Sequence, residues 1–273
     1  MLIIGELINS TRKQVKKALQ NRDEAVIRRL ARSQIEAGAD VLDVNTATSM
    51  ERETEDLEWV IGLIYDEVGE GVRLSIDSPN PEAIAAGLAL CKARPLVNSI
   101  NNNPKLQEQL IPLIKEYDPD IIGLTMGSSK GMPKTVEDRL REAELLITTL
   151  QASGPPLERL YLDPLVMTIG SNQEQARAVI DAVRAIKERW GDLGVKTSVG
   201  LSNVSFGLPQ RSIINRAFLA VLLEAGLDAA LIDPTDRGMV DILKASEALL
   251  GIDAHCLGYI KYIRARKDQP TIR

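Results

Sequence analysis

The stretch Val199-Gly-Leu-Ser-Asn-Val-Ser-Phe-Gly-Leu-Pro209 says most about the fold. A short apolar run, residues 195–201, leads directly into small and polar residues, and a helical pattern follows from Pro209. This order is typical of a buried parallel strand that ends at a functional loop. We therefore expect Ser202, Asn203 and Ser205 to lie at the mouth of the fold, where they can contact a ligand. The alternative is a capped turn, because Ser and Asn satisfy the first amides of a helix.

The same order of strand and helix recurs along the whole chain. Apolar runs predict strands at residues 2–5, 41–44, 73–76, 96–99, 120–124, 160–162, 196–200 and 229–232. Amphipathic patterns predict helices at residues 23–37, 51–68, 81–92, 105–116, 135–151, 173–189, 212–225 and 239–249. Eight strand-helix units predict an α/β protein with a TIM (β/α)8 barrel. A doubly wound sheet is less favoured, because it usually has fewer strands and a phosphate-binding glycine loop, which Gly5-Glu-Leu-Ile-Asn9 is not.

Length and composition agree with one barrel. The chain has 273 residues, and such barrels commonly form one domain of about 250 residues, so we expect residues 1–273 to form a single domain. Apolar residues make up 44% and charged residues 26%, an ordinary globular composition. The net charge of -5 and the scattered lysines and arginines argue against a nucleic-acid groove. No apolar run reaches the roughly 18 residues of a membrane helix, and the N-terminus has no signal-peptide pattern, so we expect a cytoplasmic protein.

Cysteine and histidine are scarce. The two cysteines, Cys91 and Cys256, indicate neither a disulfide framework nor a thiolate metal site. The single histidine, His255, excludes most histidine-based metal clusters and leaves a Ser-His-Asp hydrolase possible only through that residue. Aromatic residues, at 3%, are too few for a surface that stacks single-stranded nucleic acid.

Carboxylates and carboxamides stand at, or directly after, the end of almost every predicted strand. They are Glu6, Asn9, Asp43, Asn45, Asp77, Asn98, Asp163, Asn203 and Asp233. In a TIM barrel these strand ends converge on the active-site mouth. Helix capping would explain two or three of them, such as Asp77 and Asp163, but not a majority.

Such a ring of acids and amides suits a flat heterocycle with a fixed pattern of hydrogen-bonding groups. A carboxylate can accept two parallel hydrogen bonds from an N–H next to an NH2, and a pterin ring has that edge. The ring has about as many amides as acids, which suits a tightly held divalent ion less well. We expect no metal site.

The same residues carry a resemblance to a known family. The matching segments are Gly5-Glu-Leu-Ile-Asn9, Asp43-Val-Asn45, Ser75-Ile-Asp77-Ser, Val97-Asn98-Ser, Leu162-Asp163-Pro and Gly200-Leu-Ser-Asn-Val-Ser-Phe-Gly207. In register along nearly the whole chain, they resemble the methyltetrahydrofolate corrinoid methyltransferases. The resemblance implies transfer of a methyl group between N5 of methyltetrahydrofolate and the cobalt of a corrinoid (cobalamin), which a separate corrinoid protein carries, in either direction. Members are often homodimers, so we expect a homodimer.

The resemblance also assigns roles to residues. It implies that Asp77, Asn98 and Asp163 bind the pterin edge, that Asn203 is catalytic through a hydrogen bond to N5, and that Arg211 lies near the folate. It further implies that Gly200, Ser202 and Phe206 line the same pocket.

Two other functions stay open. Dihydropteroate synthase shares the barrel and the pterin-binding acids, but its seventh strand carries an Arg and a Lys where this chain has Asn203 and Val204. The eighth strand here reads Asp233-Pro-Thr in place of an Arg-x-His pair, so a diphosphate leaving group would lose its cationic support. A folate-binding module without turnover is the second alternative.

One further motif, Asp253-Ala-His-Cys-Leu-Gly258, matches the Asp-x-His-x-x-Gly pattern of corrinoid-binding domains. Only 15 residues follow Gly258, whereas such a domain needs about 100. We interpret the match as coincidence and His255 as a surface or loop residue. The corrinoid is then expected to arrive on another protein, which requires an open rim at the barrel mouth.

Overall fold

Eight parallel strands form a closed barrel in the computed structural model, which describes residues 1–48, 51–127 and 131–267. The strands pair in chain order, and β1 closes the barrel against β8. They are β1 (Leu2–Asn9), β2 (Val41–Asn45), β3 (Arg73–Asp77), β4 (Leu96–Ile100), β5 (Asp120–Leu124), β6 (Leu160–Asp163), β7 (Lys196–Gly200) and β8 (Ala229–Ile232). The predicted TIM (β/α)8 barrel is confirmed.

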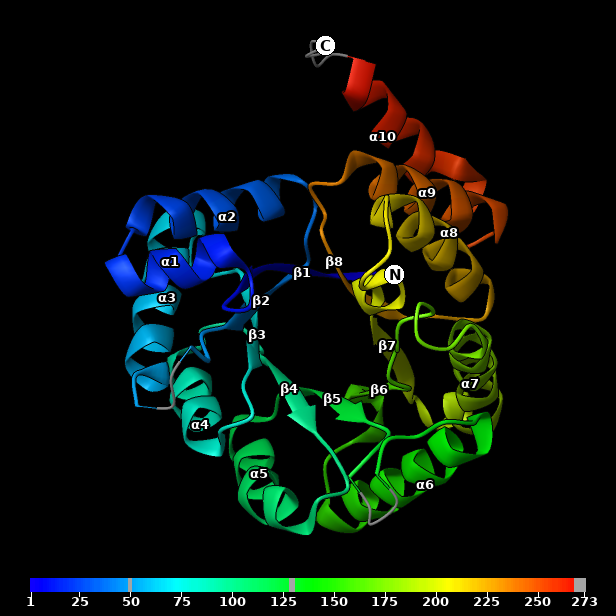
Figure 1. Ribbon diagram of the computed structural model, residues 1–273, viewed down its shortest axis with the longest axis horizontal. Helices are drawn as coiled ribbons and strands as arrows, with labels where there is room; N and C mark the ends of the chain where they lie inside the picture. Colours follow the sequence, from blue (N-terminus) through cyan, green and yellow to red (C-terminus); the bar gives the residue numbers. More distant parts are fainter. Residues whose placement is uncertain (49–50, 128–130, 268–273) are drawn as a thin grey trace.

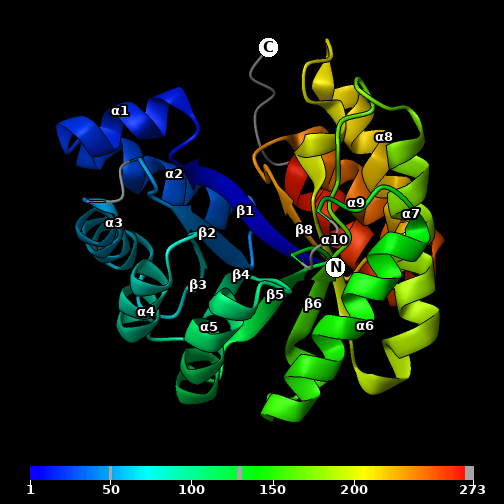
Figure 2. The ribbon, with the colours of Figure 1, turned by 60° about the horizontal axis from the view of Figure 1, so that its bottom comes forward.

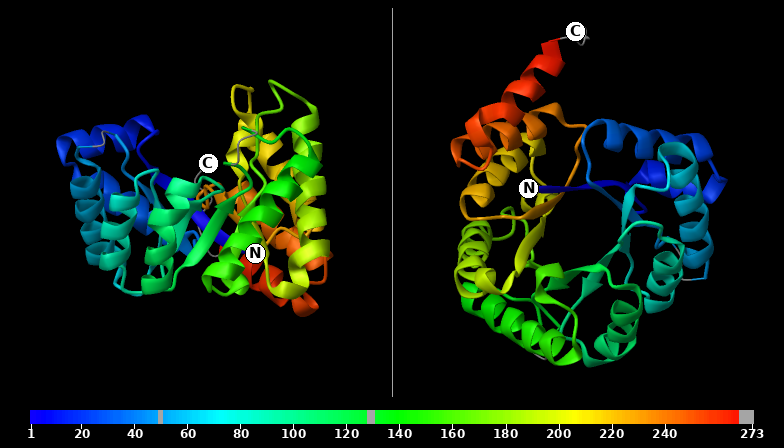
Figure 3. Two further views of the ribbon diagram at one scale, coloured as in Figure 1. Left: turned by 90° about the horizontal axis from the view of Figure 1, so that it is seen from below. Right: turned by 180° about the vertical axis from the view of Figure 1, so that it is seen from behind.

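Helices surround the strands on the outside (Figure 1). They are α1 (Lys13–Asn21), α2 (Glu24–Glu36), α3 (Glu53–Val68), α4 (Pro81–Leu90), α5 (Pro104–Tyr117), α6 (Val136–Ser153), α7 (Glu174–Trp190), α8 (Arg211–Glu224), α9 (Arg237–Leu249) and α10 (Leu257–Lys267). Helices α1 and α10 were not predicted; α10 follows α9 and projects outward from the ring of helices (Figure 3). Among the described residues, no helix combines the length and the apolar character that crossing a membrane requires.

The interior of the barrel is apolar at one end and polar at the other. Side chains near the N-terminal ends or middles of the strands pack together inside the barrel, namely Ile4, Val41, Leu96, Ile122, Tyr161 and Ala229. Larger apolar clusters fill the space between the strands and the helices outside them. The acids and amides come later in the same strands, so the apolar cluster lies beneath them. This order leaves only the C-terminal ends of the strands, visible from the side in Figure 2, to form a polar site.

Two helices that follow strands begin with the sequence Asn-Pro. Asn80 accepts a hydrogen bond from the backbone N–H of Glu82 at 3.0 Å, and Pro81 is the first residue of α4. Asn103 caps α5 in the same way, ahead of Pro104. Proline suits this position because its fixed φ is helical and the first turn needs no N–H partner. The capping role considered for Asp77 therefore belongs to Asn80, which leaves the Asp77 carboxylate available elsewhere.

Strand β1 is four residues longer than predicted, and its pairing with β2 contains an irregularity. The register shifts between Gly5 and Ile8, and the backbone N–H of Leu7 donates to Gln34 Oε1 of α2 at 2.9 Å. Gln34 is fully buried, and its Oε1 lies 2.5 Å from the position that a Cβ on Gly5 would occupy. Such a bulge redirects neighbouring side chains. Gly5 therefore makes room for the contact that stabilises the strand beside Glu6.

We expect Gly5→Ala to lower the free energy of unfolding by about 1–3 kcal/mol, because the new methyl group must displace a buried, hydrogen-bonded amide. Urea denaturation measures this. Gly62→Ala, in the exposed part of α3 where nothing lies within 4 Å of the added Cβ, is the matched control. It should stabilise the protein slightly, by about 0.5–1 kcal/mol. Equal changes in the free energy of unfolding in the two variants would contradict the proposed role of Gly5.

Candidate active site at the barrel mouth

A cavity of about 710 Å³ lies at the C-terminal ends of the strands. Six of the eight predicted site residues line it: Asp77, Gly200, Ser202, Asn203, Phe206 and Arg211. Glu6, Asp43 and Asp233 of the predicted polar ring line it too. Asn98 and Asp163 are not part of its lining and take part through neighbouring groups, as described below.

Two acids from adjacent strands lie together in this cavity. Asp43 of β2 accepts hydrogen bonds on Oδ1 from Ser75 Oγ at 2.6 Å and from Asn98 Nδ2 at 3.1 Å. Asp77 of β3 accepts one from Asn45 Nδ2 at 3.1 Å. Burial raises the pKa of Asp77 to about 6, and burial, followed by the nearby charge of Asp77, raises the pKa of Asp43 well above its usual value. Asn98 thus holds Asp43 in place.

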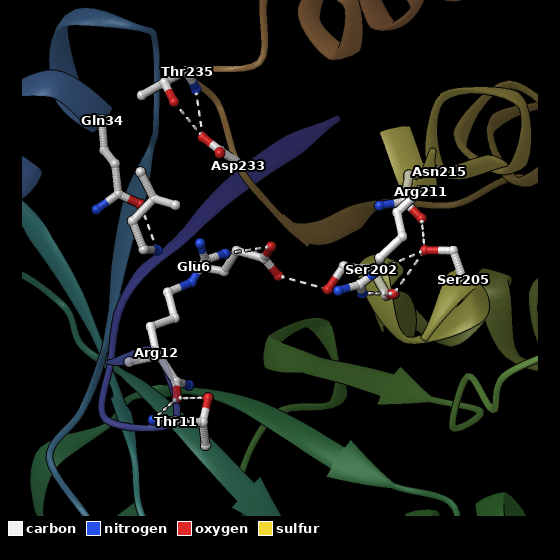
Figure 4. A network of polar contacts seen from close by, with 12 residues as sticks. Glu6, Thr11, Arg12, Gln34, Ser202, Ser205, Arg211, Asn215, Asp233 and Thr235 are labelled. Carbon is white, nitrogen blue, oxygen red and sulfur yellow. Dashed lines mark hydrogen bonds and ion pairs between the residues drawn. The ribbon is translucent and has the colours of Figure 1, made fainter. Parts of the chain in front are cut away.

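A third acid, Glu6 of β1, connects two sides of the mouth (Figure 4). Its Oε1 lies 3.0 Å from Nη2 of Arg12, and its Oε2 accepts a hydrogen bond from Ser202 Oγ at 3.4 Å. Burial raises the pKa of Glu6. On the neighbouring strand end, Asp233 accepts hydrogen bonds from Thr235 N at 2.9 Å and Thr235 Oγ1 at 2.6 Å. These contacts fix both carboxylates at the rim.

The segment after β7 is a short 3-10 turn, Leu201–Ser205, which α8 holds from behind. Arg211, the first residue of α8, donates to the backbone oxygen of Ser202 at 2.5 Å and to Ser205 Oγ at 3.0 Å (Figure 4). Ser205 donates to Asn215 Oδ1 at 2.7 Å. Ser205 is fully buried and is not part of the cavity lining, so the prediction that it faces a ligand was wrong: it supports the turn.

The alternative reading of this turn, as a helix cap, is also wrong. The residue that precedes α8 is Gln210, and no side chain caps that helix. Ser202 and Asn203 instead line the cavity. Phe206 lies at the rim with 68% of its surface exposed, and the guanidinium of Arg211 is 5.9 Å from the centre of its ring.

Asn203 and Asp163 are connected through Gly200. A Cβ on Gly200 would lie 3.1 Å from Asn203 Nδ2, so the glycine leaves space for the amide. Asp163, at the end of β6, accepts a hydrogen bond from the backbone N–H of Leu165 at 2.7 Å and interacts with the backbone N–H of Gly200. Burial raises the pKa of Asp163 to about 6. Asp163 therefore supports the backbone on which the Asn203 turn is built.

The raised pKa of Asp163 predicts a pH effect on stability. Its folded pKa of about 6 exceeds the ordinary value of 3.8. The stability that the protonated Asp163 side chain contributes is therefore fully present below about pH 4 and is lost as the pH rises through 6. The shift corresponds to about 2–3 kcal/mol. We expect Asp163→Asn to remove this loss, so that the variant gains stability relative to the wild type at neutral pH but not at about pH 4. Urea unfolding of the variant and the wild type at both pH values measures this gain. A difference in the free energy of unfolding that is the same at both pH values would contradict the prediction.

The site also contains residues that the sequence did not indicate. Arg12, Asn215 and Asp236 line the cavity but come from the loop after β1, from α8 and from the loop after β8. These three residues neither end a predicted strand nor belong to the segments that carry the family resemblance, so they carried no recognisable sequence signal. Among the described residues, no three His, Cys, Asp or Glu side chains are grouped so that they could hold a metal ion.

The Asp-x-His-x-x-Gly motif is explained by helix capping. Asp253 accepts hydrogen bonds from the backbone N–H groups of Gly258 at 2.9 Å and Tyr259 at 2.8 Å, at the start of α10. His255 is exposed and is not part of the cavity lining. The prediction that His255 is a surface or loop residue is confirmed.

Known proteins resemble this chain along most of its length. The family model described as "Pterin binding enzyme" matches residues 5–233. The methylcorrinoid:tetrahydrofolate methyltransferase of Eubacterium limosum is 35% identical over 99% of both chains. The methionine synthase of Mycobacterium leprae is 29% identical over 85% of this chain, which matches only 20% of that longer protein.

Among solved structures, the dihydropteroate synthase of Xanthomonas albilineans, in complex with 7,8-dihydropteroate, superposes with a TM-score of 0.65 over 91% of this chain and 93% of that one. At 19% identity this likeness concerns the fold. The match to the family model, and the full-length match to the Eubacterium limosum enzyme, confirm the resemblance found in the sequence. The chain belongs to the family of pterin-binding enzymes, as a full-length relative of a methylcorrinoid:tetrahydrofolate methyltransferase.

Proposed function

We propose that this protein is a methyltransferase that moves a methyl group between N5 of methyltetrahydrofolate and the cobalt of a corrinoid carried on a separate protein. The observation that carries the proposal is that the Asp77 carboxylate and the Asn203 amide line one cavity at the barrel mouth. The full-length identity to a methylcorrinoid:tetrahydrofolate methyltransferase supports the same reaction.

In this proposal the pterin ring binds against the acids of β2 and β3. Asp77 accepts hydrogen bonds from the N–H and NH2 groups of the pterin edge, a geometry that a carboxylate satisfies with both oxygens. Asn98 contributes through Asp43, to which it donates. Asp163 contributes through the backbone of Gly200. Arg211 and Phe206, at the rim, lie where the rest of the folate leaves the cavity.

The chemistry requires charge to develop on N5. A tertiary amine is a poor leaving group, so N5 must gain a proton or a strong hydrogen bond as cobalt(I) attacks the methyl carbon. The new bond joins cobalt to the methyl carbon, the electron pair of the broken carbon–nitrogen bond stays on N5, and N5 ends with a proton. Asn203 donates a hydrogen bond that strengthens as this charge changes. The proton comes from water or from a neighbouring carboxyl group.

The cavity fits dihydropteroate synthesis less well. That reaction expels a diphosphate, which needs cationic support. The arginines in the lining are Arg12 and Arg211; Arg12 is paired with Glu6, and Arg211 donates to the turn after β7. Val204, at the position of the lysine in that family, is buried.

Transfer of a labelled methyl group tests the function. The protein is incubated with cob(I)alamin and tetrahydrofolate that carries a ¹³C methyl group on N5, and NMR follows the label. We expect the label to move to cobalt, and methylcobalamin with tetrahydrofolate to give the reverse transfer. Tight folate binding without movement of the label beyond the uncatalysed rate would support the non-catalytic module instead.

Three finer expectations stay predictions: that residues 1–273 form a single domain, that the protein is a homodimer, and that it is cytoplasmic. The barrel and the matched range, residues 5–233, support the first. Light scattering during size-exclusion chromatography measures the second.

A further inference from the structure

One carboxylate oxygen of Asp43 is buried without a hydrogen-bond donor among the described residues. Asp43 is fully buried, and both hydrogen bonds that it accepts, from Ser75 and Asn98, go to Oδ1. Its Oδ2 is buried and has no hydrogen-bond partner among the described residues. A buried carboxylate oxygen without a donor is costly, so native structures usually supply a proton, a water molecule or a ligand.

The charged groups around Asp43 are all acidic. Asp77, on the adjacent strand β3, and Glu6, on β1, are the acids whose negative charges act on Asp43. Glu53, on α3, adds a further negative charge near Asp77. Among the described residues, neither Asp43 nor Asp77 forms a salt bridge. Two adjacent carboxylates without a cation do not both ionise readily, because like charges at short distance repel strongly in a buried site.

We propose that Asp43 is a neutral carboxylic acid at neutral pH, whose Oδ2–H donates to the Asp77 carboxylate and so positions Asp77 for the pterin edge. The hydrogen-bond pattern assigns the proton to this oxygen: Oδ1 already accepts from two donors, whereas Oδ2 has no donor, and the interaction between the Asp43 and Asp77 side chains supplies an acceptor for the proton. The pair then carries a single negative charge, located on Asp77. Burial raises the pKa of both groups, which agrees with one retained proton. The inference rests on the proposed function only for the identity of the ligand.

This arrangement has a consequence for recognition. Asp77 accepts from Asn45 on one side and from Asp43 on the other, so its remaining lone pairs are directed at the ligand. A charge-assisted hydrogen bond from a carboxylic acid to a carboxylate is short and orients both groups. Asp43 is therefore a positioning residue, whose side chain is required as a hydrogen-bond donor and not as a charge.

The test compares two substitutions of Asp43 by titration with 5-methyltetrahydrofolate at about pH 7. Asp43→Ala removes the donor and should weaken binding by about ten- to a hundredfold. Asp43→Asn keeps the shape, accepts from Ser75 and Asn98 through its oxygen, and donates to Asp77 through its NH2. We expect it to restore binding to within about threefold of the wild type. Loss of affinity in Asp43→Asn as large as that in Asp43→Ala would mean that the ionised acid is needed, and would overturn the proposal.

Infrared spectroscopy observes the proton itself and does not depend on folate binding. At about pH 8, above the pKa of about 6 of Asp77 and Asp163, the wild type should show the carbonyl band of a protonated buried carboxyl, and Asp43→Asn should lack it. Absence of this band from the folded wild type would overturn the proposal. If the wild type shows the band but does not bind the folate, the proposed function fails and the shared proton stands.

Discussion

Asn203→Ala is expected to slow methyl transfer by about a hundred- to a thousandfold while folate affinity stays within about threefold. The reason is that the amide hydrogen bond becomes strong only when charge develops on N5, whereas the carboxylate of Asp77 holds the pterin in the ground state as well. Removal of a group that acts mainly in the transition state lowers the rate and leaves binding largely intact.

Single-turnover transfer and equilibrium folate titration, carried out on the same preparation, separate the two effects. Asn21→Ala, at the exposed end of α1, is the matched control because it removes an identical side chain away from the cavity. Equal losses of rate and affinity in Asn203→Ala would make Asn203 a ground-state contact only. An unchanged rate would exclude it from the reaction.

Asp77→Asn is expected to weaken folate binding by about a hundredfold. The substitution removes the charge that strengthens the hydrogen bonds to the pterin edge. It also turns one acceptor into an NH2 donor that faces the donors of the ligand. Because the pterin is bound through this contact both before and during transfer, the loss should appear mainly as a higher Kd.

Isothermal titration measures this effect. Asp66→Asn is the control: Asp66 is an exposed acid of α3 that pairs with Arg28 at 3.1 Å, and such a surface pair contributes little. An Asp77→Asn variant that binds folate as tightly as the wild type would exclude the proposed orientation of the pterin and move the recognition edge to another acid in the cavity, such as Glu6 or Asp233.

The sequence predicted the barrel because each strand is a short apolar run bounded by polar residues, and all eight runs are strands in the structure. It also predicted that the acids and amides gather at one end, which follows from parallel strands in a closed barrel. Glu6 and Asn9, which were predicted to follow the first strand, lie inside β1 because this strand extends to Asn9. The apolar pattern of residues 2–5 gave no sign of the bulge, which depends on a contact with Gln34 from α2.

The direction of individual side chains was less predictable. Ser202 and Ser205 have the same chemistry and lie three positions apart, yet the first lines the cavity and the second supports it from below. That difference depends on Arg211 and Asn215 of α8, which pack against the turn only in the folded chain. Asn98 and Asp163 were assigned to the pterin edge. Each instead contacts a residue that lines the cavity, Asp43 for Asn98 and Gly200 for Asp163, so each contributes through that residue.

The proposed methyl transfer is tested by stopped-flow oxidation of cob(I)alamin by 5-methyltetrahydrofolate, with wild-type protein beside Asn203→Ala and Asp77→Asn. We expect rapid loss of the cob(I)alamin absorbance with the wild type. We expect a slow reaction at every folate concentration with Asn203→Ala, and recovery of the rate at high folate with Asp77→Asn. A wild-type rate no faster than the reaction without protein would exclude methyl transfer by this protein.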